Sequence, residues 1–270
     1  MGIGFQDWLE MSSLTILTAI ILAIVEGITE YLPVSSTGHT ILAAAILGIE
    51  QTSFVKSFIL VLEFGSIVSV VVLYWRMFLK IEILKRLIVG VIPTGIVGLL
   101  FYRIFKNSLL GNVQIVLWAL LLGGVFLIVF EWRYKERATY DDVERIPYRH
   151  CLLIGAFQSL SIIPGLSRST ATITGGLFLG LKRQTIVLYS FLLAVPTLIG
   201  ASGYDLLVSV SQFTLAQLNL LLIGGVTSFL VALLVIKLFL SYIRTKNFLP
   251  FGVYRIILVL AFYILVVRAV

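Results

Sequence analysis

Long apolar runs follow one another through almost the whole of the chain. Six of them are long enough to cross about 30 Å of hydrocarbon at about 1.5 Å per residue. They are Ser57–Trp75, Leu84–Tyr102, Val113–Phe130, Ile186–Leu206, Leu215–Ile236 and Pro250–Val267. Only 12% of the 270 residues are charged and 60% are hydrophobic, whereas about a quarter of a soluble domain is charged. The sequence therefore predicts an all-α polytopic membrane protein.

Two further apolar regions are interrupted in the middle by short polar segments. Leu14–Gly48 is broken at residues 33–39, and Leu152–Leu181 is broken at residues 164–170. Each break contains proline and glycine, and the apolar pieces on either side are too short to cross a bilayer as helices. They suit re-entrant hairpins better than full spans. We therefore expect six transmembrane helices plus two re-entrant helical hairpins.

The order of these elements repeats on the two sides of one charged segment. A hairpin and three spans occupy residues 12–131, a second hairpin and three spans occupy residues 150–268, and the polar residues 132–149 join them. Because three spans per half is an odd number, the second half must be inverted relative to the first within one integral membrane domain, residues 1–270. Broken helices at corresponding positions of inverted halves are typical of a binding site near the bilayer midplane.

The basic residues predict the orientation. Of the 20 Lys and Arg residues, Arg168 and Arg255 lie within apolar runs and 4 lie in segments that this arrangement puts outside, which leaves 14 for the cytoplasmic segments. The bias follows the positive-inside rule and predicts that both termini are outside. We expect the side chain of Arg255 to extend from the last span to the cytoplasmic surface. Basic residues clustered between apolar runs indicate membrane topology and do not indicate nucleic-acid binding. The first ten residues contain no Lys or Arg, so the basic region of a signal peptide is not found there.

Two glutamates in the first broken region are four residues apart. Glu26 and Glu30 therefore share one helix face in an otherwise apolar run. A buried charge costs about 2.5–3.5 kcal/mol at membrane depth, so each carboxylate needs a neutralising partner. A divalent cation such as Mg²⁺ binds one or two carboxylates together with phosphate oxygens. A purely structural pair closed by Arg168 is the alternative, and Glu63 is a candidate third acid.

The first polar break is rich in hydroxyl groups. Ser35, Ser36 and Thr37 are followed by His39. Hydroxyls and free backbone N–H groups at a helix start bind anions. His39, three residues after Ser36, is suited to act as a base or as the partner of a nucleophile. Simple helix capping is the alternative interpretation.

The second polar break adds a cation to the same kind of segment. Ser167, Arg168 and Ser169 are followed by Thr172 at the start of a helix. The planar guanidinium offers two parallel donors to a phosphate. These residues predict an anion site. The alternative is that Arg168 is only a counter-ion to the glutamates and binds no ligand. A phosphatase and a transporter or translocase of an anionic lipid both remain open at this point.

Two segments resemble the signatures of a known family. Residues 26–39 read EGITEYLPVSSTGH and residues 164–169 read PGLSRS, and both are similar to the undecaprenyl-diphosphatase (bacitracin-resistance) family. The similarity continues over nearly the whole chain. The resemblance implies a multi-pass phosphatase of the bacterial inner membrane that hydrolyses undecaprenyl diphosphate to the monophosphate and recycles the cell-wall lipid carrier. It also implies a divalent metal, Mg²⁺ or Ca²⁺, and an active site open to the outer face.

The resemblance also implies roles for individual residues. Glu26 and Glu30 take the metal-binding and acid/base positions, and Ser36 and His39 take the nucleophile and base positions, with the choice of nucleophile left open. The positions that bind phosphate are Arg168, Ser35, Thr37, Ser167, Ser169 and Thr172. Thr170 and Glu63 depart from the glycine and glutamine that are usual in the family. The oligomeric state stays open, a homodimer included.

Overall fold

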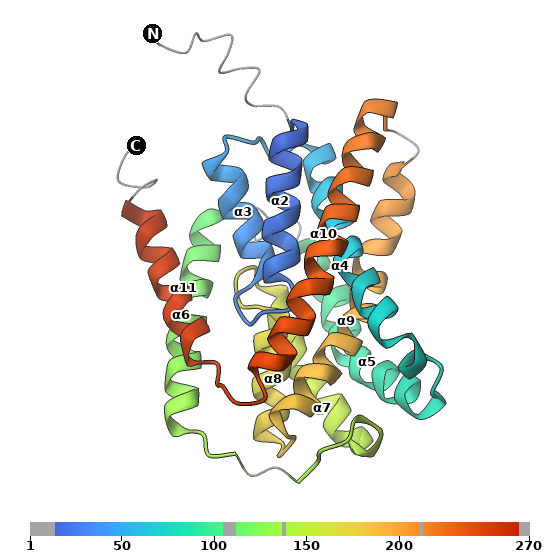
Figure 1. Cartoon of the computed structure of the whole chain (residues 1–270), viewed down its shortest axis with the longest axis vertical. Helices are drawn as coiled ribbons and strands as arrows, with labels where there is room; N and C mark the ends of the chain where they lie inside the picture. The colour runs from blue at the N-terminus through green and yellow to red at the C-terminus, as the bar shows by residue number, and fades with distance from the viewer. Residues whose placement is uncertain (1–13, 105–111, 137–138, 211–212, 265–270) are drawn as a thin grey trace.

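The computed structural model of the chain describes residues 14–104, 112–136, 139–210 and 213–264 (Figure 1). Almost all of these residues are helical, and the only β-structure among them is an isolated bridge between Tyr140 and Leu181. In chain order the elements are α2 (Ile16–Thr29), α3 (Ser36–Ile46), α4 (Ser53–Phe78), α5 (Ile81–Ile104), α6 (Val113–Arg133), η2 (Val143–Arg145), α7 (Tyr148–Ser159), η3 (Leu160–Ile162), α8 (Arg168–Phe178), α9 (Arg183–Val210), α10 (Leu215–Tyr242) and α11 (Leu249–Phe262).

Five helices, α4, α5, α6, α9 and α10, are long and apolar enough to cross a membrane. They coincide with the first five expected spans, and the prediction of an all-α polytopic membrane protein is confirmed. The sixth expected span corresponds to α11, of which 14 residues are helical here, while residues 265–267 lie outside the described part of the chain. Large apolar side chains such as Leu99, Trp118 and Leu122 point outward, because lipid is the solvent for these faces.

The two broken regions form pairs of half-length helices. Helices α2 and α3 have 14 and 11 residues, and helices α7 and α8 have 12 and 11. At about 1.5 Å per residue none of them reaches across the hydrocarbon. Figure 1 shows that the two pairs come from opposite ends of the molecule and that their turns meet in the middle. The turns therefore bring their polar residues to the centre of the apolar mass.

Each half-length pair packs on a span of the other half of the chain. Helix α2 lies against α10, and α7 lies against α5. Both contacts are close because glycine removes the side chain: a Cβ at Gly27 would lie 2.8 Å from the carbonyl oxygen of Ser228. At Gly155 a Cβ would overlap the backbone carbonyl of Gly90. Small residues permit this approach where lipid offers no hydrophobic drive for helix association.

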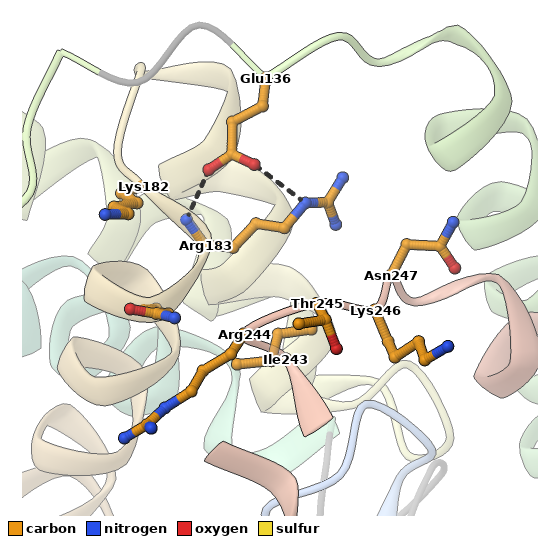
Figure 2. Close-up of a pocket in the computed structure, with 9 residues that line it drawn as sticks. Glu136, Lys182, Arg183, Ile243, Arg244, Thr245, Lys246 and Asn247 are labelled. Carbon is orange, nitrogen blue, oxygen red and sulfur yellow. Dashed lines mark hydrogen bonds and ion pairs between the residues drawn. The ribbon is translucent and has the colours of Figure 1, made fainter. Parts of the chain in front are cut away.

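The segments that carry most of the positive charge gather at one end of the molecule. Arg183 donates to both carboxylate oxygens of Glu131 at 2.5 and 2.8 Å, and Lys80 pairs with Glu144 in the linker. The hydrogen bond that Lys80 donates to Glu144 raises the pKa of Lys80. A cavity of about 370 Å³ lies at this end, and Figure 2 shows the residues that line it. Its lining is Glu136, Lys182, Arg183, Gln184, Ile243, Arg244, Thr245, Lys246 and Asn247.

Candidate active site

Residues of the two turns interlock at the centre of the molecule. Ser169, at the start of α8, donates its hydroxyl to the carbonyl oxygen of Leu32 at 2.9 Å. Ser167 and Ser169 share a hydrogen bond of 2.9 Å between their hydroxyls. Residues about 137 positions apart along the chain therefore form one polar cluster. The cluster is buried, unlike the cavity of Figure 2, which lies at the linker end.

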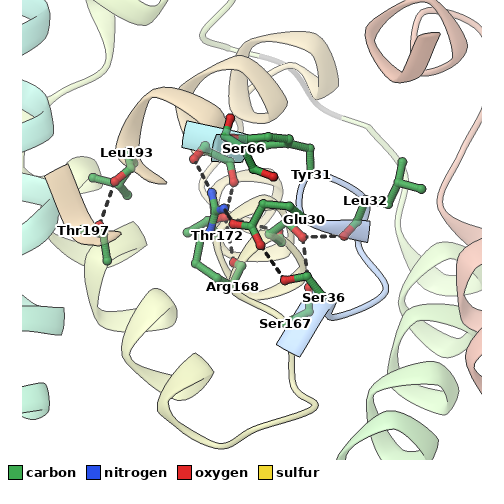
Figure 3. Close-up of polar contacts among 12 residues, drawn as sticks. Glu30, Tyr31, Leu32, Ser36, Ser66, Ser167, Arg168, Thr172, Leu193 and Thr197 are labelled. Carbon is green, nitrogen blue, oxygen red and sulfur yellow. Dashed lines mark hydrogen bonds and ion pairs between the residues drawn. The ribbon is translucent and has the colours of Figure 1, made fainter. Parts of the chain in front are cut away.

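Glu30 lies at the centre of this cluster (Figure 3). Ser36 donates its hydroxyl to Oε2 of Glu30 at 2.5 Å, and Nη2 of Arg168 donates to Oε1 at 2.6 Å. All three side chains are largely withdrawn from solvent. A hydroxyl proton, a carboxylate and a guanidinium that is suited to phosphate are thus brought together by residues from both turns.

A second donor of Arg168 is held by α9. Nη1 donates to the carbonyl oxygen of Ser190 at 2.9 Å, and the guanidinium lies over the ring of Tyr31 at 5.8 Å from its centroid. The hydroxyls of Thr172 and Ser190 are 2.6 Å apart. Ser190 was not among the residues selected from the sequence, because a single serine in an apolar span carries no signal of its own.

The two serines that begin the inner helices have an unusual backbone. Ser35 and Ser167 have φ of 74° and 77°, the only positive values at non-glycine residues in the described chain. Each caps its helix, Ser35 by accepting from the N–H of Gly38 and Ser167 by accepting from the N–H of Thr170. Backbone strain of this kind persists only where the surrounding structure enforces it, and it is common at functional sites. The two turns therefore begin their inner helices with the same strained serine cap.

His39 does not contact the Ser36 hydroxyl in this structure. Its Nδ1 lies 2.7 Å from the carbonyl oxygen of Ser35, and its Nε2 lies 2.9 Å from the hydroxyl of Tyr254. A carbonyl only accepts, so Nδ1 carries the proton. When the ring is neutral, Nε2 accepts from the hydroxyl of Tyr254. The acceptor for the Ser36 proton is therefore Glu30. Thr37 lies in the same turn and is half-buried.

Glu26 carries the observation that bears on a metal. The residue is completely buried, and neither carboxylate oxygen has a hydrogen-bond partner among the described residues. Glu30 lies one helical turn away, and Glu63 lies within electrostatic range. Unpaired buried carboxylate oxygens fit a divalent cation. The described residues contain no group of three or more His, Cys, Asp or Glu side chains arranged for a metal, so any cation held here would need oxygens from a phosphate or water as well.

The expectation for Arg255 is wrong. Its side chain is completely buried and does not extend to the surface. Nη2 donates to the hydroxyl of Thr170 at 2.8 Å and to the carbonyl oxygen of Leu166 at 3.2 Å. The sequence favours an exposed guanidinium because Arg255 lies close to the end of its span, where a long side chain can reach the surface. The position of Arg255 along the sequence does not reveal that the second turn places hydrogen-bond acceptors beside α11.

Comparisons with known proteins show the family of this chain. The family described as bacitracin resistance protein BacA matches residues 19–261. The undecaprenyl-diphosphatase of Aquifex aeolicus is 48% identical over 246 residues, which cover 90% of this chain and 96% of that protein. The undecaprenyl-diphosphatase of a Sulfurihydrogenibium species is 47% identical, with 93% and 99% covered. That of Campylobacter jejuni is 44% identical, with 92% and 94% covered.

Proposed function

This chain belongs to the family of bacitracin resistance protein BacA, and we propose from that membership that it is an undecaprenyl-diphosphate phosphatase of the membrane. It hydrolyses the phosphoanhydride of undecaprenyl diphosphate to undecaprenyl phosphate and inorganic phosphate, and so recycles the cell-wall lipid carrier. Bacitracin resistance is the trait named in the family description. Within the structure itself, the single observation that supports the proposal is the buried cluster in which Ser36 and Arg168 both bond to Glu30.

The cluster suggests how the reaction begins. Glu30 takes the proton of the Ser36 hydroxyl as the serine oxygen attacks the terminal phosphorus, and the bridging oxygen leaves with undecaprenyl phosphate. A water molecule then cleaves the phosphoserine ester and releases inorganic phosphate. Direct attack by His39 is the alternative, but both ring nitrogens are engaged by Ser35 and Tyr254.

Proton transfer to Glu30 would also change what Arg168 binds. While Glu30 is charged, Nη2 of Arg168 pairs with it at 2.6 Å. Once the carboxylate holds the Ser36 proton, that ion pair loses its negative partner. Nη2 is then free for a phosphoryl oxygen, on which negative charge accumulates during transfer, while Nη1 stays on the carbonyl oxygen of Ser190. One carboxylate thereby couples removal of the serine proton to stabilisation of the phosphoryl group.

We also propose a divalent cation, Mg²⁺ or Ca²⁺, held by Glu26 and Glu30 together with phosphate oxygens. The unpaired oxygens of Glu26 support it. When bound, such a cation would neutralise charge on the diphosphate. The hydroxyls of Ser167, Ser169 and Thr172 then serve to bind and orient the phosphates beside Arg168, with Ser35 and Thr37 at the opposite turn.

The orientation that we propose puts the linker end in the cytoplasm of a bacterial cell and opens the site to the outer face of its inner membrane. The basic segments that meet at the linker end support this placement. The beginning of α2 and the end of α11 lie at the opposite end of the molecule (Figure 1).

The test is phosphate release by the protein purified in detergent. We expect inorganic phosphate and undecaprenyl phosphate in equal amounts, loss of the reaction in excess chelator, and recovery on adding Mg²⁺. Glu26→Gln should remove this metal dependence together with most of the turnover, because the amide cannot replace the charge of the carboxylate. Detergent provides no second compartment, so a transporter would bind the substrate and release no phosphate. That result would overturn the proposal, and full activity in chelator would remove the metal from it.

A further inference from the structure

The guanidinium of Arg255 is an anomaly that the mechanism above does not use. It is completely buried on α11, and its Nε and Nη1 have no hydrogen-bond partner among the described residues. A buried charge with unpaired donors is costly, and an apolar side chain of similar size is often the more stable choice at such a position. Stability alone is therefore a poor explanation for this arginine.

The two bonds that Arg255 does make bracket the second turn. Nη2 donates to the carbonyl oxygen of Leu166 and to the hydroxyl of Thr170. The three residues between these acceptors include Ser167, with its positive φ, and Arg168, which pairs with Glu30. A single guanidinium thus holds both ends of the strained segment that carries the phosphate-binding arginine.

The preceding residue of α11 holds the first turn. The hydroxyl of Tyr254 bonds to Nε2 of His39, and the two rings are stacked, 5.5 Å apart and 9° from parallel. Successive residues of a helix point about 100° apart. Tyr254 and Arg255 can therefore reach different turns from one position on α11.

Helix α6 leaves room for Arg255 and for the close approach of α11. A Cβ on Gly123 would overlap Nη1 of Arg255, and a Cβ on Gly124 would lie 2.8 Å from the carbonyl oxygen of Gly252. Both glycines are needed, one for the guanidinium and one for the close approach of α11. The slot for the buried arginine is thus built by two helices of different halves.

We infer that Tyr254 and Arg255 are positioning residues that keep the two turns in register for phosphoryl transfer. Arg255 acts through the backbone and hydroxyl that flank Arg168, and Tyr254 acts through the ring of His39. Neither needs to contact the substrate. The inference rests on the proposed phosphatase activity for its kinetic consequence, but the mechanical role of Arg255 is independent of that activity.

The main experiment compares Arg255→Met with the wild-type full-length chain in detergent. We expect a melting temperature that is equal or higher, because unpaired donors are removed, and kcat reduced roughly 10- to 100-fold, because a small displacement of catalytic groups has effects of this size. Arg255→Lys should recover part of kcat, since one ammonium can donate to the same acceptors without the planar fork. Arg244→Met makes the same chemical change at an exposed arginine and should keep the wild-type kcat.

A second readout does not depend on catalysis. Hydrogen exchange of the backbone amides of residues 167–171 should become faster in Arg255→Met, even if the wild-type protein releases no phosphate. This separates a failure of the inference from a failure of the proposed function. Wild-type kcat together with wild-type exchange in Arg255→Met would overturn the inference.

Two further variants keep the inference testable if Arg255→Met does not fold. Tyr254→Phe removes one hydroxyl, and we expect a several-fold lower kcat at unchanged melting temperature, with Tyr242→Phe near the linker end as the matched control. Thr170→Val removes an acceptor of Arg255. In the double variant with Arg255→Lys, the loss of kcat should be smaller than the sum of the two single losses, because both changes act on one contact. Additive losses, or wild-type kcat in Tyr254→Phe, would contradict the respective half of the inference.

Discussion

At the scale of single residues, the chemistry depends on which group lies beside the Ser36 hydroxyl. The sequence makes His39 an obvious partner, because it follows one helical turn later. In the folded chain the partner is Glu30, which also holds Arg168. A carboxylate between a hydroxyl and a guanidinium can act as the base for the hydroxyl and as the counter-ion of the guanidinium. The roles of Ser36 and Arg168 should consequently separate in kinetics.

Ser36→Ala and Arg168→Ala should fail in different ways. Ser36→Ala removes only a hydroxyl, so substrate should still bind while turnover falls by roughly 10³-fold or more, as for loss of a nucleophile. Arg168→Ala should weaken binding and turnover together, and Arg168→Lys should recover only part of both. Single-turnover kinetics with binding measured separately distinguishes these patterns. Equal loss of binding in the two alanine variants would show that the roles are divided wrongly.

At the scale of elements, the site depends on half-length helices that cannot cross the membrane on their own. Helix α2 obtains its position by packing on α10, where Gly27 brings the two backbones close together. The contact lies one residue from Glu26, so packing of the helix and placement of the carboxylates are linked. The strained caps at Ser35 and Ser167 then set the directions of the inner helices.

Gly27→Ala should destabilise the protein by about 1–3 kcal/mol, because the added methyl would lie 2.8 Å from both the carbonyl oxygen of Ser228 and the Cβ of Val231. Thermal unfolding in detergent measures this as a lower melting temperature. Gly95→Ala is the matched control, since a Cβ at that position of α5 has no heavy atom within 4 Å. A melting temperature unaffected by Gly27→Ala would mean that the close contact of α2 with α10 does not hold the hairpin.

At the scale of the whole molecule, the arrangement is that of two halves with the same order of elements. Before the linker, two short helices precede three long ones. After it, two short helices precede the long helices α9 and α10 and then α11, of which 14 residues are helical. The short pairs come from opposite ends (Figure 1). An inverted repeat is the simplest account of this order, and it stays a prediction together with the count of six spans. Its consequence for topology can be measured.

Reporter fusions should locate the two ends of the molecule. Fusions at Thr139 and Thr245 should read as cytoplasmic, because both lie at the linker end with its basic segments. A fusion at Val270 should read as external. A cytoplasmic signal from Val270 would refute the inverted arrangement, whereas an external signal from Thr139 would reverse the orientation as a whole.

The sequence by itself determined that the chain is a membrane protein, that it is helical, and where its two polar turns lie. These follow from local properties: apolar length, breaks at proline and glycine, and charges that are too costly to bury without a role. It also identified Glu30, Ser36 and Arg168 as residues of one site, although 138 positions separate the first from the last.

Only the tertiary structure decided how those residues pair. The pairing of Ser36 with Glu30, the contact of Arg168 with Ser190, and the burial of Arg255 depend on helices that meet from distant parts of the chain. Arg255 shows the physical reason most clearly. Its distance from the end of a span favours an exposed guanidinium, but hydrogen-bond acceptors in a turn more than 80 residues earlier hold it inside. Such acceptors exist only once α11 has packed beside that turn, so a local pattern along the chain contains no trace of them.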